Sequence, residues 1–229
     1  MTIYSLLMIM PKHPSQKSAP KPRPRPALTH QIRIIGGDWK RTPLPVVEAA
    51  GLRPTPDRVR ETVFNWLTHL LDGQWSGVTC LDLFAGTGAL GLEAASRGAA
   101  RVMLVEESQA VVRQLEATRD KLNASQVSIL RGDARTVAQA LQRRLAGPAD
   151  RYHLIFLDPP FHADLLPVML PLCADLLAAG GYVYVETEKL IDGTILPEWL
   201  RGWQVVRADQ AGMVFFHLLQ CQNLHVIEA

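Results

Sequence analysis

From residue 78 onward, short apolar runs alternate with longer segments whose apolar residues recur every three or four positions. Such runs predict buried strands, and the three-to-four spacing predicts amphipathic helices. The expected strands are 78–84, 101–106, 126–134, 152–161 and 181–188, and the expected helices are 89–98, 108–124, 135–147 and 163–181. Their alternation predicts an α/β fold, with a mostly parallel sheet that carries helices on both faces.

Two segments depart from this alternation. Residues 203–219 hold two strand-like runs around Gly212, which predicts a hairpin that adds antiparallel strands and brings the sheet to seven. Residues 53–73 read as a helix with one apolar stripe, in which Thr55 is the expected N-cap, Pro56 suits the first turn and Gly73 marks the end.

Charge and composition divide the chain into four expected parts. Residues 1–41 hold eight Lys or Arg against one acid, whereas the remainder holds 16 basic and 21 acidic residues. We expect a disordered, basic, Pro-rich tail over 1–30, a small N-terminal extension with short strands and a helix over 31–74, the main domain over 75–221 and a C-terminal tail over 222–229. The tail can bind a polyanion or only keep the chain soluble.

Cysteine usage and hydropathy limit the class of protein. Cys80, Cys173 and Cys221 are far apart and form no CxxC pair, which argues against a zinc site or a disulfide framework and fits a reducing compartment. No apolar run reaches the roughly 18 residues of a membrane span. We therefore expect a cytoplasmic protein without a metal or a membrane anchor.

Ligands of parallel sheets bind at the carboxyl ends of the strands, where the first strand is followed by "LDLFAGTGALGLE". Gly86, Gly88 and Gly91 match G-x-G-x-x-G, and Glu106 ends the second strand. This pattern is typical of NAD-binding turns, although a tight strand-to-helix turn without a ligand also produces it.

Asp82 shifts the balance between cofactors. A carboxylate directly before the glycines repels a pyrophosphate but attracts an ammonium or sulfonium cation, and S-adenosylmethionine (SAM) carries both cations and no phosphate. The two oxygens of Glu106 can then accept from the two ribose hydroxyls. Asp133, after the third strand, can accept from the adenine amino group or cap the next helix.

The chain resembles a known family at several motifs. "DLFAGTGALGLE" is similar to the SAM-binding motif of class I methyltransferases with a Rossmann-like fold, and "DPPF" resembles the (D/N/S)PP(Y/F) motif of those that methylate exocyclic amino groups. With "RIIGGDWKRTPLPV" and "GLRPTPDRVRETVFNWL", the order is similar to the RsmD family of 16S rRNA (guanine(966)-N2)-methyltransferases, from about Arg33 to about Gln220.

This resemblance implies a cofactor, a partner and a set of site residues. The cofactor is SAM, the partner is 16S rRNA, alone or within a 30S subunit, and the enzyme is expected to be a monomer. The implied cofactor-binding residues are Asp82, Phe84, Ala85, Gly86, Gly88, Glu106, Asp133 and Ala134. Ser108 departs from the family, which often has Asp two positions after the ribose-binding Glu.

The DPPF segment is the expected catalytic motif, comprising Asp158, Pro159, Pro160 and Phe161. The guanine 2-amino nitrogen is a weak nucleophile because its lone pair is delocalised into the ring. Asp158 and the Pro159 carbonyl can accept hydrogen bonds from its two N–H groups. Asp158 can also stabilise the positive charge that moves to nitrogen, and this role does not require a strongly raised pKa of Asp158. The prolines stiffen the loop, and Phe161 offers a face on which the base can stack.

Other candidates have ordinary alternatives. Arg33, Arg53, Arg58 and Arg60 can bind RNA phosphate or simply be solvated. Glu186 and Glu188 can line the base pocket, although surface charge is the commoner role. The competing functions are methylation of adenine N6 or of DNA, an NAD oxidoreductase, and an RNA-binding module without catalysis.

Overall fold

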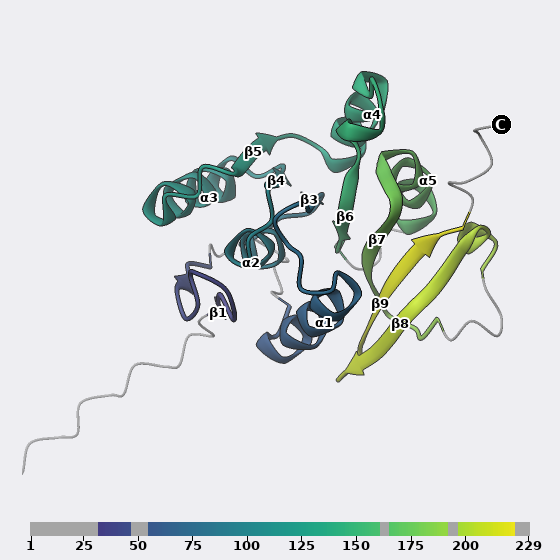
Figure 1. The fold of residues 1–229 in the computed structure, drawn as a ribbon, viewed down its shortest axis with the longest axis horizontal. Helices are drawn as coiled ribbons and strands as arrows, with labels where there is room; N and C mark the ends of the chain where they lie inside the picture. Colours follow the sequence, from purple (N-terminus) through teal and green to yellow (C-terminus); the bar gives the residue numbers. More distant parts are fainter. Residues whose placement is uncertain (1–31, 47–54, 161–164, 192–196, 223–229) are drawn as a thin grey trace, which may run out of the picture. The chain divides into compact units, whose positions relative to one another are not determined.

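The computed structural model describes residues 32–46, 55–160, 165–191 and 197–222, all of which belong to one unit that spans residues 31–229. A seven-stranded sheet runs through this unit in the order β5-β4-β3-β6-β7-β9-β8 (Figure 1). The strands are β3 (Thr79–Asp82), β4 (Arg101–Glu106), β5 (Val127–Arg131), β6 (Tyr152–Leu157), β7 (Leu177–Thr187), β8 (Trp203–Ala211) and β9 (Val214–Cys221).

The topology of the sheet confirms the predicted fold class. Strands β3 to β7 pair in parallel, whereas β9 runs antiparallel to both β7 and β8. The chain moves outward from β3 to β4 and β5, then returns to place β6 on the other side of β3. The order of the strands therefore reverses beside β3, and such a reversal is where parallel sheets bind ligands.

Helices cover both faces of the sheet, because central strands such as β3 and β6 are apolar on both sides. One core unites α1 (Asp57–Leu70), α2 (Ala89–Ser96) and α3 (Gln109–Leu122) with one face of the sheet, through side chains such as Phe64, Leu92 and Phe156. The other core joins α4 (Ala134–Arg144) and α5 (Leu166–Leu176), which lie side by side, to the opposite face. Short 3-10 turns at Pro148–Asp150 and Glu198–Leu200 complete the elements.

The N-terminal extension pairs two short strands, β1 (Ile32–Arg33) and β2 (Pro43–Leu44), as predicted. The segment between them is bound to α2. Backbone N–H groups of Ile35 and Gly36 donate to the Glu93 carboxylate at 2.6 and 2.8 Å, and that of Trp39 donates to the Ser96 hydroxyl at 2.9 Å. The extension therefore rests on the helix that follows the glycine turn.

Two local predictions are wrong. The fourth predicted helix ends at Leu176, and β7 begins at Leu177, because that residue pairs with Tyr152 before a bulge. The N-cap of α1 is Pro56, and the Thr55 hydroxyl makes no capping bond; it donates instead to two carboxylates at the sheet edge. Among the helices of the described ranges, none has both the length and the apolar composition that a bilayer crossing requires.

Candidate active site

The glycine turn between β3 and α2 has the geometry that its sequence predicts. Gly88 is the N-cap of α2 and has φ of 77°, a left-handed conformation that favours glycine. At Gly91 the constraint is space, since an added Cβ would lie 2.2 Å from the Leu104 side chain and 3.2 Å from the Asp82 carboxylate. The turn therefore brings its backbone close to the ends of β3 and β4.

Asp82 is buried at the end of β3, with 2% of its surface exposed. Its carboxylate accepts a hydrogen bond from the Gly91 N–H at 3.1 Å. Burial raises the pKa of Asp82 to about 7; the N–H groups of Gly91 and Phe84 oppose this rise, and the charge of Glu106 adds to it. Phe84 and Ala85 follow in the turn itself. An acid in this position becomes an anion readily only when a cation lies beside it.

Glu106 is held at the mouth of the same turn. Its two carboxylate oxygens accept from the backbone N–H groups of Gly86 at 3.0 Å and Ser108 at 2.8 Å. Asp133 caps α4, because it accepts from both the N–H and the hydroxyl of Thr136, at 2.8 and 2.7 Å. These bonds lower the pKa of Asp133. The predicted capping role is thus confirmed, and the buried Ala134 follows it.

Four carboxylates stand in a row along this edge of the sheet, and we call Glu106, Asp82, Asp158 and Glu186 the acid row. They belong to or directly follow β4, β3, β6 and β7, which are neighbours in that order. The pairing registers of these strands place all four on one face, since side chains alternate faces with a period of two. The described residues nevertheless contain no cluster with the arrangement of a metal site.

Asp158 and Glu186 are joined by the side chain of Thr55. The Thr55 hydroxyl lies 3.0 Å from Glu186 Oε1 and 3.4 Å from Asp158 Oδ2, and the Tyr184 hydroxyl donates to the same Glu186 oxygen at 2.7 Å. Burial, followed by the charges of Glu186 and Asp82, raises the pKa of Asp158 well above its usual value. Glu186 is 7% exposed, so its alternative role as a surface charge is wrong.

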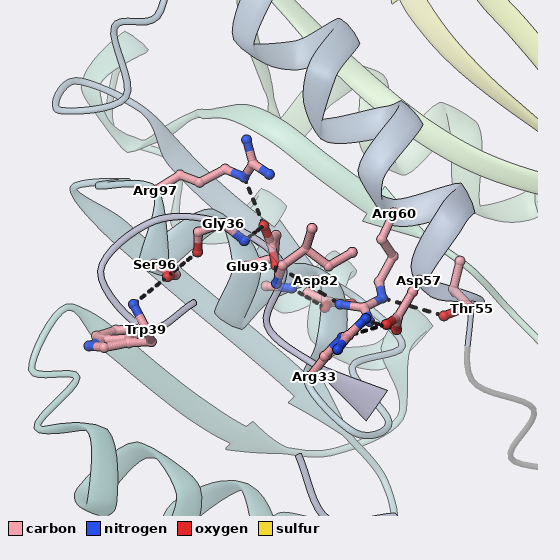
Figure 2. A network of polar contacts seen from close by, with 12 residues as sticks. Arg33, Gly36, Trp39, Thr55, Asp57, Arg60, Asp82, Glu93, Ser96 and Arg97 are labelled. Atoms are coloured by element: carbon pink, nitrogen blue, oxygen red, sulfur yellow. Dashed lines mark hydrogen bonds and ion pairs between the residues drawn. The ribbon is translucent and has the colours of Figure 1, made fainter. Parts of the chain in front are cut away.

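Arg60 was predicted to contact RNA phosphate, and this prediction is wrong. Its side chain is fully buried, and its guanidinium donates to Asp57 at 2.6 Å and to the Thr55 carbonyl at 3.4 Å (Figure 2). It also lies 4.0 Å from the buried Glu93 carboxylate. Arg60 therefore holds the start of α1 in place and is not available to a phosphate.

The remaining predicted residues lie at the surface or outside the described ranges. Arg33 is exposed and binds Asp57 at 3.0 Å, and Arg58 is exposed on the first turn of α1. Pro159 is partly buried and Pro160 is exposed after β6. Arg53 and Phe161 lie outside the described residues, so their predicted roles stay predictions.

Comparison with known proteins identifies this arrangement. The family described as Conserved hypothetical protein 95 matches residues 32–220. The chain belongs to this family. Ribosomal RNA small subunit methyltransferase D of Escherichia coli (strain K12) is 42% identical over 201 residues, which cover 86% of this chain and 94% of that protein. The corresponding protein of Haemophilus influenzae is 37% identical over 194 residues, covering 83% and 94%.

A solved structure leads to the same family. The "putative methyltransferase yhhF" from Escherichia coli matches with a TM-score of 0.69 at 38% identity, and the match covers 84% of this chain and 98% of that one. The predicted resemblance to the RsmD family is therefore confirmed, and this member of the family is a methyltransferase. The NAD oxidoreductase is wrong as an alternative.

Sequence reasoning missed the contacts between distant segments at the site. Arg60 precedes the buried Val63, Phe64 and Leu67 by three, four and seven positions, and this spacing is the signal that it faces the core. Tyr184 lies two positions before Glu186 on one strand, which places both side chains on one face. Nothing in the local sequence indicates that Thr55 reaches these strands.

Proposed function

We propose that this methyltransferase transfers a methyl group from SAM to the exocyclic 2-amino group of a guanine in 16S rRNA, at guanine 966. The observation that carries the proposal is the position of Asp158, which follows β6 directly beside the strand that leads into the glycine turn. An acceptor of N–H bonds thus lies next to the cofactor turn. The RNA substrate follows from relatives named as ribosomal RNA small subunit methyltransferases.

The residues at the turn fit SAM. Asp82 and Glu106 give this end of the sheet a negative charge, which suits a cofactor with two cations and opposes a pyrophosphate. Asp82 faces the turn beside the expected sulfonium and ammonium groups, and Glu106 would accept from the ribose hydroxyls. Asp133 and Ala134, at the end of β5, would border the adenine. When bound, SAM supplies an electrophilic methyl group on a positively charged sulfur.

The chain's own contribution is to orient and stabilise the amino group. Asp158 and the Pro159 carbonyl accept hydrogen bonds from its two N–H groups. These hydrogen bonds direct the nitrogen lone pair away from the ring and toward the methyl carbon. As the N–C bond forms and the C–S bond breaks, the positive charge moves to nitrogen, where Asp158 stabilises it. The surplus proton on nitrogen then passes to Asp158 or to solvent.

The raised pKa of Asp158 adds a condition to this mechanism. We expected that no strong rise was needed, but burial and the neighbouring acids favour the neutral carboxyl group in the free protein. A cation next to Asp158 favours its ionised form. The group therefore becomes an effective acceptor once the cofactor cation lies beside it.

The alternatives differ in the acceptor. Enzymes that methylate adenine N6 tend to have Asn at the position of Asp158, so the aspartate favours guanine as the acceptor. Within the proposal, the enzyme acts as a monomer on rRNA in an assembled or assembling 30S subunit. The proposal places it in the cytoplasm, where rRNA is modified.

The test is methyl transfer from tritiated SAM to small-subunit rRNA that lacks the modification, followed by identification of the labelled nucleoside. N2-methylguanine supports the proposal, and N6-methyladenine contradicts it. Asp158→Ala is expected to bind SAM normally but to lose activity by on the order of 10²- to 10³-fold, because one preorganised acceptor is gone. Asp209→Ala, at an exposed position of β8, is the matched control. Near-normal turnover of Asp158→Ala would refute the assignment.

A further inference from the structure

We infer that Glu186 selects guanine, by accepting the ring N1–H of the target base while Asp158 accepts from its 2-amino group. This inference rests on the proposed function and assigns to Glu186 a contact with substrate. It concerns Glu186, the one member of the acid row that lies beyond Asp158, away from the cofactor turn.

The position of Glu186 follows from the sheet. Strands β6 and β7 are parallel neighbours, and their register places Asp158 and Glu186 side by side on one face at their carboxyl ends. Both carboxylates lie within 3.4 Å of the Thr55 hydroxyl. Along the edge, Glu106 and Asp82 face the cofactor turn, Asp158 stands next, and Glu186 is last. A base that presents its amino group to Asp158 thus has Glu186 beside its ring.

The chemistry of the bases makes this arrangement selective. Guanine presents two adjacent kinds of donor on its Watson–Crick edge, the N1–H and the 2-amino group, and two neighbouring carboxylates complement them. Adenine presents its 6-amino group next to an unprotonated N1, whose lone pair would face a carboxylate. The pair of acids therefore accepts guanine and repels adenine.

Neighbouring hydroxyls prepare Glu186 for this contact. Thr55 and Tyr184 both donate to Glu186 Oε1, at 3.0 and 2.7 Å. Donors directed at a carboxylate fix its orientation. Thr55 is itself held by Arg60, which donates to its carbonyl oxygen. Two buried groups thus orient Glu186, and this degree of support is typical of a side chain that contacts a substrate.

The test compares guanine with 2-aminopurine at the target position of the RNA. 2-Aminopurine keeps the 2-amino group but has no proton on N1, so it separates recognition of the ring from the chemistry at the amine. The wild-type enzyme is expected to methylate the guanine RNA on the order of 10- to 100-fold more efficiently, the range of one hydrogen bond to a charged group. Glu186→Gln should bring this ratio close to one, because its amide can donate to the bare N1.

The possible outcomes distinguish a failure of the inference about Glu186 from a failure of the proposed function. If Glu186 only anchors Thr55, the Gln variant loses activity on both RNAs equally and the ratio is unchanged, which overturns the inference. Glu188→Gln, at the exposed position two residues further on, should keep the wild-type ratio. If Glu186→Gln does not fold, the wild-type ratio alone decides, since equal rates on both RNAs overturn the inference. A wild-type enzyme that labels no guanine N2 contradicts the proposed function itself.

Discussion

Asp82 shows how a single buried acid couples the cofactor to protons. It has almost no contact with solvent, and burial raises its pKa to about 7. In the unfolded chain an aspartate has a pKa of about 3.9. The folded state therefore favours the neutral acid, and stability from this group is complete below the unfolded pKa and lost as the pH rises through about 7. A bound cation reverses this preference.

The affinity for SAM should consequently depend on pH. Between about pH 6 and about pH 8, we expect the affinity of the wild-type protein to rise about tenfold, as one proton leaves Asp82. Asp82→Asn should bind SAM more weakly and show a flatter profile. Isothermal titration calorimetry across this pH range measures both. A variant that keeps the full pH dependence would assign the proton to another group.

Residues after strands were predictable, and residues that bridge segments were not. Asp82, Glu106 and Asp158 could be placed from sequence because a strand followed by an acid has a fixed location in a parallel sheet. Thr55 resembles a helix N-cap in sequence. In the structure its hydroxyl is directed at the carboxylates of Asp158 and Glu186 instead of a backbone N–H of α1. Arg60 has the charge of a surface residue, and only its partners Asp57 and Glu93 make its burial possible.

At the scale of elements, α2 connects the cofactor turn to the N-terminal extension. Glu93, fully buried on this helix, accepts from the backbone of Ile35 and Gly36 and from Arg97 at 2.8 Å, and it lies near Arg60 (Figure 2). One carboxylate therefore ties three segments together. The sequence predicted these segments as elements, but their mutual contacts include a hydrogen bond from a backbone N–H to a side chain about 60 residues away.

Removal of this carboxylate should destabilise the whole unit. Glu93→Ala is expected to lower the free energy of unfolding by about 3–5 kcal/mol, because buried Arg60 would lose one of its two carboxylate partners and the N–H groups of Ile35 and Gly36 would lose their acceptor. Urea unfolding measures the change. Glu116→Ala, at an exposed position of α3, is the control and should change the stability by less than about 0.5 kcal/mol. A loss at Glu93 no larger than that of the control would mean that the network contributes little.

At the scale of the whole molecule, charge separates the chain into a basic end and an acidic body. Residues 1–30 hold five Lys or Arg and no acid, whereas the acid row lies at the sheet edge. We call residues 1–30 the arm. RNA binding through the arm would release counterions, and a substrate base would still have to approach the acid row. The fold class was predictable from the alternation of strands and helices. The role of the arm was not, because it depends on a binding partner whose structure the sequence of this chain does not encode.

A salt titration of RNA affinity tests the arm. The full chain and a chain without residues 1–30 should differ in the slope of log affinity against log salt by roughly 1–3, for a few lost phosphate contacts. A full-length variant with Gln at the five basic positions should match the shortened chain. Equal slopes for all three proteins would leave the arm without a part in binding.

The acid row also sets an order of events. Without a cation, burial and the neighbouring acids keep the Asp158 carboxyl group neutral, so it is a poor acceptor for the target amine and RNA should enter after the cofactor. Transfer of the methyl group converts the sulfonium into a neutral thioether, and Asp158 returns to its neutral form. RNA should therefore bind several-fold more tightly beside sinefungin, an unreactive analogue with an amine in place of the sulfonium, than beside S-adenosylhomocysteine. Equal affinities would show that the charge of the cofactor has no influence on the affinity for RNA. If the affinities differ as expected, the loss of the cofactor's positive charge during methyl transfer weakens RNA binding, and the reaction itself then promotes release of the methylated RNA.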